Sequence, residues 1–107
     1  MSSYHFQPSL IDLLPAVPED SITSRTFYTG DQYKAILFSF AAGQELSEHT
    51  ASVPAMLYFV QGEADLTLGE DKMEARAGTW AQMPAQLPHS IYARTPVLML
   101  LLMFQAK

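Results

Sequence analysis

The chain of 107 residues contains no cysteine. Without a thiol it cannot form a disulfide framework, a thiolate zinc site, an iron–sulfur cluster or a cysteine nucleophile. The sequence also lacks the Gly-x-Ser-x-Gly pattern that presents a nucleophilic serine on a sharp turn, and it has no glycine-rich loop to hold a phosphate. These absences exclude several large classes of enzyme.

Positive charge is scarce as well. Six Lys and Arg residues face eleven Asp and Glu residues, so the formal net charge is -5, and no run of four basic residues occurs. Binding to a phosphate backbone depends on clustered Lys and Arg. We therefore expect no nucleic acid as a partner.

No long hydrophobic run is present. The longest apolar stretch, Val97–Phe104, is too short to cross about 30 Å of hydrocarbon. The segment from Met1 to His5 lacks the charged and apolar regions of a signal peptide. Together with 49% hydrophobic and 16% charged residues, these features predict one compact, soluble, cytoplasmic domain with no membrane partner.

The first part of the chain, residues 1–21, reads as an N-terminal arm. Pro8, Pro15 and Pro18 interrupt it, and the apolar run between them is too short for a stable isolated helix. Leaving apolar side chains in water forfeits roughly 1.5 kcal/mol or more for each. We therefore expect the arm to pack against its own barrel or a partner subunit through Leu10, Ile11, Leu13, Leu14 and Val17.

The remainder, residues 22–107, is predicted to be a single all-β domain. Short apolar segments closed by Gly or Pro recur about every ten residues, which is typical of a barrel or sandwich. No segment predicts a helix of three turns. The eight expected strands are 22–28, 33–41, 55–61, 64–68, 73–76, 79–83, 89–93 and 97–104.

The last of these strands, Val97–Phe104, shows no alternation of polar and apolar residues. Such a strand must be covered on both faces or must pack at a subunit interface. Combined with the apolar arm, this pattern predicts a homodimer.

Two stretches of the sequence contain its most informative histidines. His49 lies in a stretch framed by Gly43 and Gly62, with five residues between Gly43 and the histidine. His89 closes a second stretch that begins at Gly78 and continues through Pro84 and Pro88. These two stretches resemble the signature motifs of the cupin family, in particular small bacterial single-domain cupins of the RmlC-like type with a reduced metal motif.

The resemblance implies a jelly-roll barrel, the cupin double-stranded β-helix, with a pocket at its mouth. In metal-binding cupins, two histidines and a glutamate of the first motif and the histidine of the second hold a divalent ion. Here Ala51 stands at the second histidine position and Ala55 at the glutamate position. Gln86 replaces the usual glycine of the second motif, and Ala93 replaces its closing asparagine. The resemblance thus implies an incomplete metal site with His49 and His89 as its remaining ligands.

Three interpretations of the histidine pair stay open. The imidazoles could hold a metal that is completed by water, a ligand carboxylate or a nearby side chain: Gln44, Glu48, Gln61 or Gln86. They could act as hydrogen-bonding groups of a ligand pocket, with one as a general base near neutral pH. They could also be satisfied by local hydrogen bonds and have no further role.

We predict a protein that binds or senses a small organic molecule in the barrel mouth, with an unassigned reaction. Its predicted pocket comprises His49, His89, Gln86, Trp80, Tyr58, Phe40 and Met83. The alternative is a metal-dependent enzyme of the dioxygenase, isomerase or decarboxylase type that uses the two histidines and an atypical third ligand. The sequence does not identify a cofactor, and a weakly held divalent metal is the one candidate.

Overall fold

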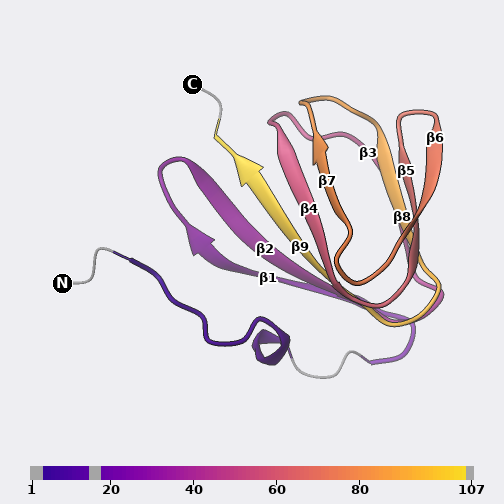
Figure 1. Ribbon diagram of the computed structural model, residues 1–107, viewed down its shortest axis with the longest axis horizontal. Coiled ribbons are helices and arrows are strands. Elements are labelled where there is room, and N and C mark those ends of the chain that lie inside the picture. Colours follow the sequence, from indigo (N-terminus) through magenta and orange to yellow (C-terminus); the bar gives the residue numbers. More distant parts are fainter. Residues whose placement is uncertain (1–3, 15–17, 106–107) are drawn as a thin grey trace.

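The computed structural model describes residues 4–14 and 18–105 as two facing antiparallel β-sheets preceded by an arm (Figure 1). The five-stranded sheet has the order β1-β2-β9-β4-β7, and the four-stranded sheet has the order β3-β8-β5-β6. Its elements are η1 (Ile11–Leu13), β1 (Ile22–Thr29), β2 (Tyr33–Phe40), β3 (Glu45–His49), β4 (Ala55–Gln61), β5 (Ala64–Leu68), β6 (Asp71–Ala75), β7 (Trp80–Met83), β8 (His89–Ala93) and β9 (Val97–Phe104). The all-β jelly-roll prediction is confirmed.

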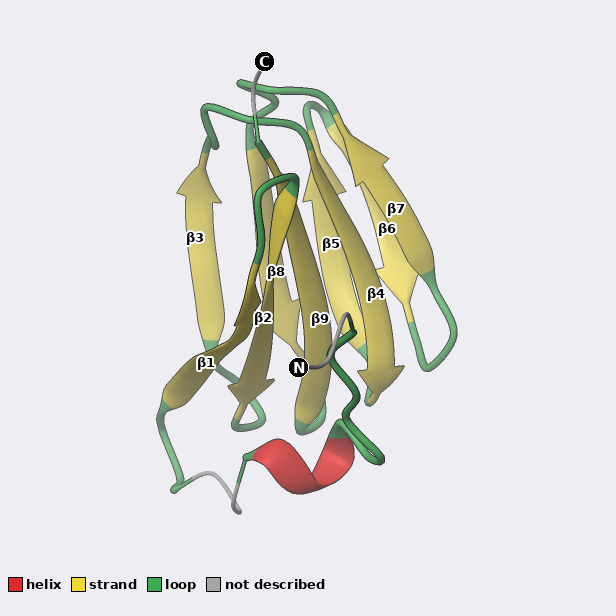
Figure 2. Cartoon of the chain, turned by 90° about the vertical axis from the view of Figure 1, so that its left-hand side faces the viewer, coloured by secondary structure: helices red, strands yellow, loops and turns green. Residues whose placement is uncertain are grey.

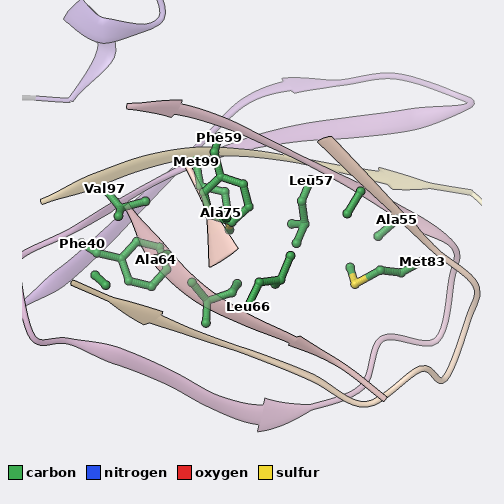
Figure 3. Close-up of a cluster of buried hydrophobic side chains, with 13 residues drawn as sticks. Phe40, Ala55, Leu57, Phe59, Ala64, Leu66, Ala75, Met83, Val97 and Met99 are labelled. Atoms are coloured by element: carbon green, nitrogen blue, oxygen red, sulfur yellow. The ribbon is translucent and has the colours of Figure 1, made fainter. Parts of the chain in front are cut away.

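Alternation along the strands sends one set of side chains into the space between the sheets. On β4, Ala55, Leu57 and Phe59 are buried while Tyr58 points to the other side of the sheet. On β5, Leu66 is buried and Asp65 is exposed, as its alternating sequence predicts. The inward side chains form one apolar core that runs the length of the barrel (Figure 3).

One strand was not predicted from the sequence. β3 carries mostly polar residues and lies at the edge of its sheet. Leu46 is its one half-buried residue, and the other four are exposed to water. Polar edge strands give little hydrophobic periodicity, so the pattern of eight strands missed it. The described residues therefore form nine strands.

The missing alternation in β9 has a structural explanation. β9 lies between β2 and β4, and its residues Val97 and Met99 enter the core between the sheets. Leu98 points outward and is nevertheless 6% exposed, and Leu37, on the same outer face of β2 and opposite Leu100, is fully buried. The beginning of β9 is thus covered on both faces.

The arm supplies cover on the outer face of the five-stranded sheet. The Nη1 atom of Arg25 on β1 donates a hydrogen bond of 3.0 Å to the carbonyl oxygen of Leu13. A groove on this face is lined jointly by Leu10 of the arm and by Leu100 and Leu102 of β9. Of the two expected alternatives, the barrel or a partner subunit, these features show the arm lying against its own barrel.

The expected burial of the arm needs one correction. Leu10, Leu13 and Leu14 are half-buried, but Ile11, the first residue of the single 3-10 turn, is 49% exposed because it borders an open cavity at the end of the barrel. Val17, also expected to be buried, lies outside the described residues.

Gly62 marks the place where the chain passes from the five-stranded sheet to the four-stranded sheet. Its φ angle is +93°, in the left-handed region that L side chains rarely adopt. A Cβ atom added there would collide with the backbone carbonyl oxygen of Pro96. The crossing therefore requires glycine.

Within residues 4–14 and 18–105, the structure contains no helix with the length and apolar character needed to span a bilayer.

The outer face of β4 and β7 carries an apolar pair that the arm leaves exposed. Tyr58 and Trp80 lie opposite each other in the register and are 39% and 58% exposed. Exposed apolar patches of this kind mark interaction surfaces, and a two-fold contact is the commonest solution. We propose a homodimer that buries this face.

Light scattering should return about twice the chain mass of 11.9 kDa, since a specific dimer buries on the order of 1,000 Å² or more. The double variant Tyr58→Lys/Trp80→Glu should be monomeric. Met73→Glu, which changes an exposed apolar side chain on the other sheet, should leave the dimer intact. A monomeric parent protein at micromolar concentration would contradict the proposal.

Candidate functional site

His49 and His89 meet at one end of the barrel. His49 is the last residue of β3 and His89 is the first residue of β8, and the antiparallel register places them directly opposite each other. Their ring centroids are 4.1 Å apart, with 58° between the ring planes. The sequence separates the two histidines by about forty positions, and strand pairing brings them into contact.

Backbone carbonyls determine which nitrogen of each ring carries the proton. The Nδ1 atom of His49 lies 2.7 Å from the carbonyl oxygen of Ser47, and the Nδ1 atom of His89 lies 2.9 Å from that of Leu87. A carbonyl oxygen can only accept, so both Nδ1 atoms must donate. When the rings are neutral, both Nε2 atoms are therefore unprotonated and have a free lone pair.

The two rings differ in their exposure. His89 is 6% exposed, whereas His49 lies at the surface. Burial lowers the pKa of His89 below its usual value of 6.5, and the neighbouring His49 lowers it further, against the opposing effect of the hydrogen bond to Leu87. His89 is consequently neutral near pH 7.

The surroundings of the pair are largely apolar. Leu68 of β5 lies directly across from His89 in the sheet, and the half-buried Leu87 packs against the core just before it. Met83 and Ala55, which pair with each other, form the end of the core on the facing sheet (Figure 3). A ligand at this end would meet two nitrogen acceptors beside apolar side chains.

Gln86 holds the loop that leads into β8. Its backbone N–H donates a hydrogen bond of 2.7 Å to the carbonyl oxygen of Ala51, two residues after His49. Its φ angle is +71°, which is uncommon for a residue with a side chain. The loop and the segment that follows β3 are thus tied together beside the histidine pair.

The structure brings together only part of the predicted pocket. His49, His89, Met83 and Gln86 lie at the same end of the barrel. Phe40 is buried at the other end of the core, next to Val97 (Figure 3).

Tyr58 and Trp80, also predicted to line the pocket, occupy the outer face of the five-stranded sheet. Alternation is the reason, because their neighbours Leu57 and Ala81 are the residues that point inward.

Two features of the site were missed by the sequence reasoning. The carbonyl groups of Ser47 and Leu87 fix the tautomers, and backbone groups give no signal in a sequence. Leu68 borders His89 through a strand pairing between β5 and β8. The sequence predicted the strand 64–68 that contains Leu68, but not which strand lay beside it.

The donor set does not fit a conventional metal site. Two Nε2 atoms are available, while open catalytic sites usually provide three protein ligands. Within the part of the chain that the structure describes, no three His, Cys, Asp or Glu residues are grouped so that they could hold a metal ion. Ala55, at one of the positions where the resemblance implied a ligand, is buried with its methyl group in the core.

Comparisons with known proteins agree with this architecture. The family model described as "Cupin domain" matches residues 36–104. A search of the curated proteins found no match.

Solved structures of similar fold cover almost the whole chain. A cupin superfamily protein from Desulfitobacterium hafniense DCB-2 is 27% identical, with a TM-score of 0.83, and the match covers 91% of this chain and 88% of that one. A conserved protein of unknown function from Streptococcus pyogenes is 29% identical, with a TM-score of 0.76 and coverages of 84% and 79%. An RmlC-like cupin protein from Desulfovibrio desulfuricans is 25% identical, with a TM-score of 0.77 and coverages of 94% and 97%.

The family model spans well over half of the residues, and it includes both histidine-bearing strands. The chain therefore belongs to the cupin family.

Proposed function

We propose that this cupin binds or senses a small organic molecule at the barrel end that carries His49 and His89. The observation that carries the proposal is the pair of adjacent imidazoles whose Nδ1 atoms are both engaged by backbone carbonyls. This arrangement leaves two Nε2 acceptors beside the apolar side chains of Leu68, Leu87 and Met83.

The chemistry of the pair indicates the kind of ligand. In the neutral form of the rings, their Nε2 acceptors favour a group that donates hydrogen bonds, such as a hydroxyl, an amide N–H or an enol. Burial of His89 supports this preference, because the lowered pKa keeps that ring in its neutral form. An apolar or aromatic body would contact the leucine and methionine side chains.

A second candidate is a metal-dependent enzyme of the dioxygenase, isomerase or decarboxylase type. One observation favours it: metal-binding histidines commonly donate their other ring N–H to a backbone carbonyl, as both histidines do here. The small number of protein ligands argues against it. We therefore rank ligand binding first.

A matched pair of probes tests the proposal. Phenol can donate a hydrogen bond to Nε2, whereas anisole, with a methyl ether in place of the hydroxyl, cannot. Phenol should bind about fivefold more tightly, the usual net worth of one hydrogen bond, and should shift the NMR signals of both imidazole rings.

The variant His49→Ala/His89→Ala should bind the two probes equally. Tyr58→Ala, on the outer face, should keep the preference for phenol. Equal binding of phenol and anisole by the parent protein, or an unchanged preference in the double histidine variant, would contradict the proposal.

The pH dependence of stability follows from the lowered pKa of His89. Below about pH 6.5 the imidazole takes up a proton more readily in the unfolded chain than in the folded chain. The free energy of unfolding should therefore fall as the pH drops from 7 through the lowered pKa of the folded state. In urea unfolding, the free energy of unfolding should decrease more over this pH range in the parent protein than in His89→Gln. A His89 ring whose pKa measured by NMR lies above 6.5 would refute this.

Metal binding should be weak because two of the usual ligands are alanines. Calorimetry with Zn²⁺ should give low affinity, and a mild chelator should remove the ion. Adding Ala51→His should raise the affinity at least about tenfold by supplying a third ligand. The double variant Ala51→His/Ala55→Glu also adds a carboxylate, at a position that is buried in the parent protein. If the double variant does not fold, the Zn²⁺ affinity of the single variant Ala51→His tests the prediction.

His49→Ala should abolish the remaining Zn²⁺ affinity. Stoichiometric metal that survives chelation in the parent protein would favour the enzyme alternative instead.

A further inference from the structure

A cavity of about 670 Å³ lies at the other end of the barrel from the histidine pair. It forms where the arm passes the end of β2 and the beginning of β9, and Figure 2 shows the 3-10 turn below these strand ends. Phe40, Val97 and Leu98 contribute apolar surface from the sheet. Ile11 and Leu14 contribute apolar surface from the arm.

The charged residues that line the cavity are both acidic. Glu19 and Asp20 reach it from the turn that precedes β1, and Ser39 and Gln61 add neutral polar groups. Among the residues that the structure describes, no Lys, Arg or His lines the cavity, and the salt bridges found belong to Arg94, on the other sheet's side of the barrel. The cavity therefore combines an apolar interior with negative charge that has no cationic partner in the described structure.

Hydrogen bonds fix both walls of the cavity. On the acidic side, the hydroxyl of Ser21 donates a hydrogen bond of 2.7 Å to the carbonyl oxygen of Pro18. The backbone N–H of Ala41 donates one of 2.9 Å to the carbonyl oxygen of Ser21. On the arm side, Arg25 holds the carbonyl of Leu13. The walls are thus anchored to β1 and to the end of β2 without a ligand.

The backbone at Asp20 is unusual. Its φ angle is +59°, in the left-handed region, where Asp and Asn are the best tolerated residues after glycine. This conformation is maintained within the hydrogen-bonded turn from Pro18 to Ser21. The turn therefore fixes the backbone from which both carboxylates extend.

We propose that this cavity is a binding site for a small organic cation, an ammonium group on an apolar or aromatic body. Its volume falls within the roughly 300–1,000 Å³ that small-molecule sites occupy. The apolar body would cover Ile11, which is 49% exposed, and the carboxylates of Glu19 and Asp20 would face the cationic group. This site is separate from the histidine pair and has the opposite preference, for a positively charged ligand rather than a neutral donor.

The test uses 2-phenylethylammonium and its neutral counterpart 2-phenylethanol, with binding followed by backbone NMR. The ammonium probe should bind about fivefold more tightly than the alcohol, as expected for partly exposed charge pairs. The shifted signals should come from residues 11–14, 39–42 and 96–98. Raising the ionic strength to about 1 M should remove most of the preference, because the Debye length then falls to about 3 Å.

Two matched variants separate the local charge from the net charge of the protein. Glu19→Gln/Asp20→Asn removes both carboxylates, keeps the side-chain shapes and retains a residue that tolerates a positive φ at position 20. This variant should bind the ammonium and the alcohol equally. Glu70→Gln/Asp71→Asn makes the same change at an exposed hairpin and should keep the preference.

Three results would overturn the proposal. The first is equal affinity of the parent protein for the two probes. The second is a preference that survives in Glu19→Gln/Asp20→Asn. The third is a set of shifts centred on His49 and His89, which would place the cation at the histidine end instead. Since the phenol and anisole experiment reads the histidine rings, the two proposals can fail independently.

Discussion

Burial of the beginning of β9 on both faces is the constraint on which the rest of this structure depends. On one side, Val97 and Met99 complete the core between the sheets. On the other side, Leu98 and, on β2, Leu37 would be exposed to water in a bare barrel. Burying such side chains stabilises the folded chain by roughly 1.5–3 kcal/mol each, so the outer face of β9 requires a second layer. The arm provides it, and the arm also encloses the cavity at that end of the barrel.

The histidine pair depends on strand register rather than on proximity in the chain. β3 and β8 are antiparallel neighbours, and their pairing ends with His49 opposite His89. The carbonyls that orient the rings belong to Ser47 and Leu87, two residues before each histidine. A shift of β3 by one residue would turn His49 to the opposite face of the sheet and separate the pair. The site is therefore a product of the same ladder that holds the four-stranded sheet together.

The two ends of the barrel offer different chemistry. One end presents the two imidazole rings, and burial disfavours the cationic form of His89. The other presents the carboxylates of Glu19 and Asp20 over an apolar floor. A core that extends from Met83 to Phe40 separates them, as Figure 3 shows. Ala51 and Ala55 place small side chains near the first end, and the side chain of Ala55 is buried in the core.

The sequence by itself determined the fold class, the positions of most strands, and the two histidines. Alternation in β5, punctuation by glycine and proline, and the spacing around His49 and His89 are local properties, so they can be read along the chain. The sequence did not identify β3, because a polar edge strand shows little hydrophobic periodicity. It placed Phe40, Tyr58 and Trp80 in the pocket because residue type alone does not reveal toward which face of the sheet a side chain points. Only the tertiary structure decided which residues meet: the contact between His49 and His89, the cover over β9 and the acidic cavity all arise from contacts between segments far apart in sequence. Such contacts depend on register and packing, which a list of residues does not contain.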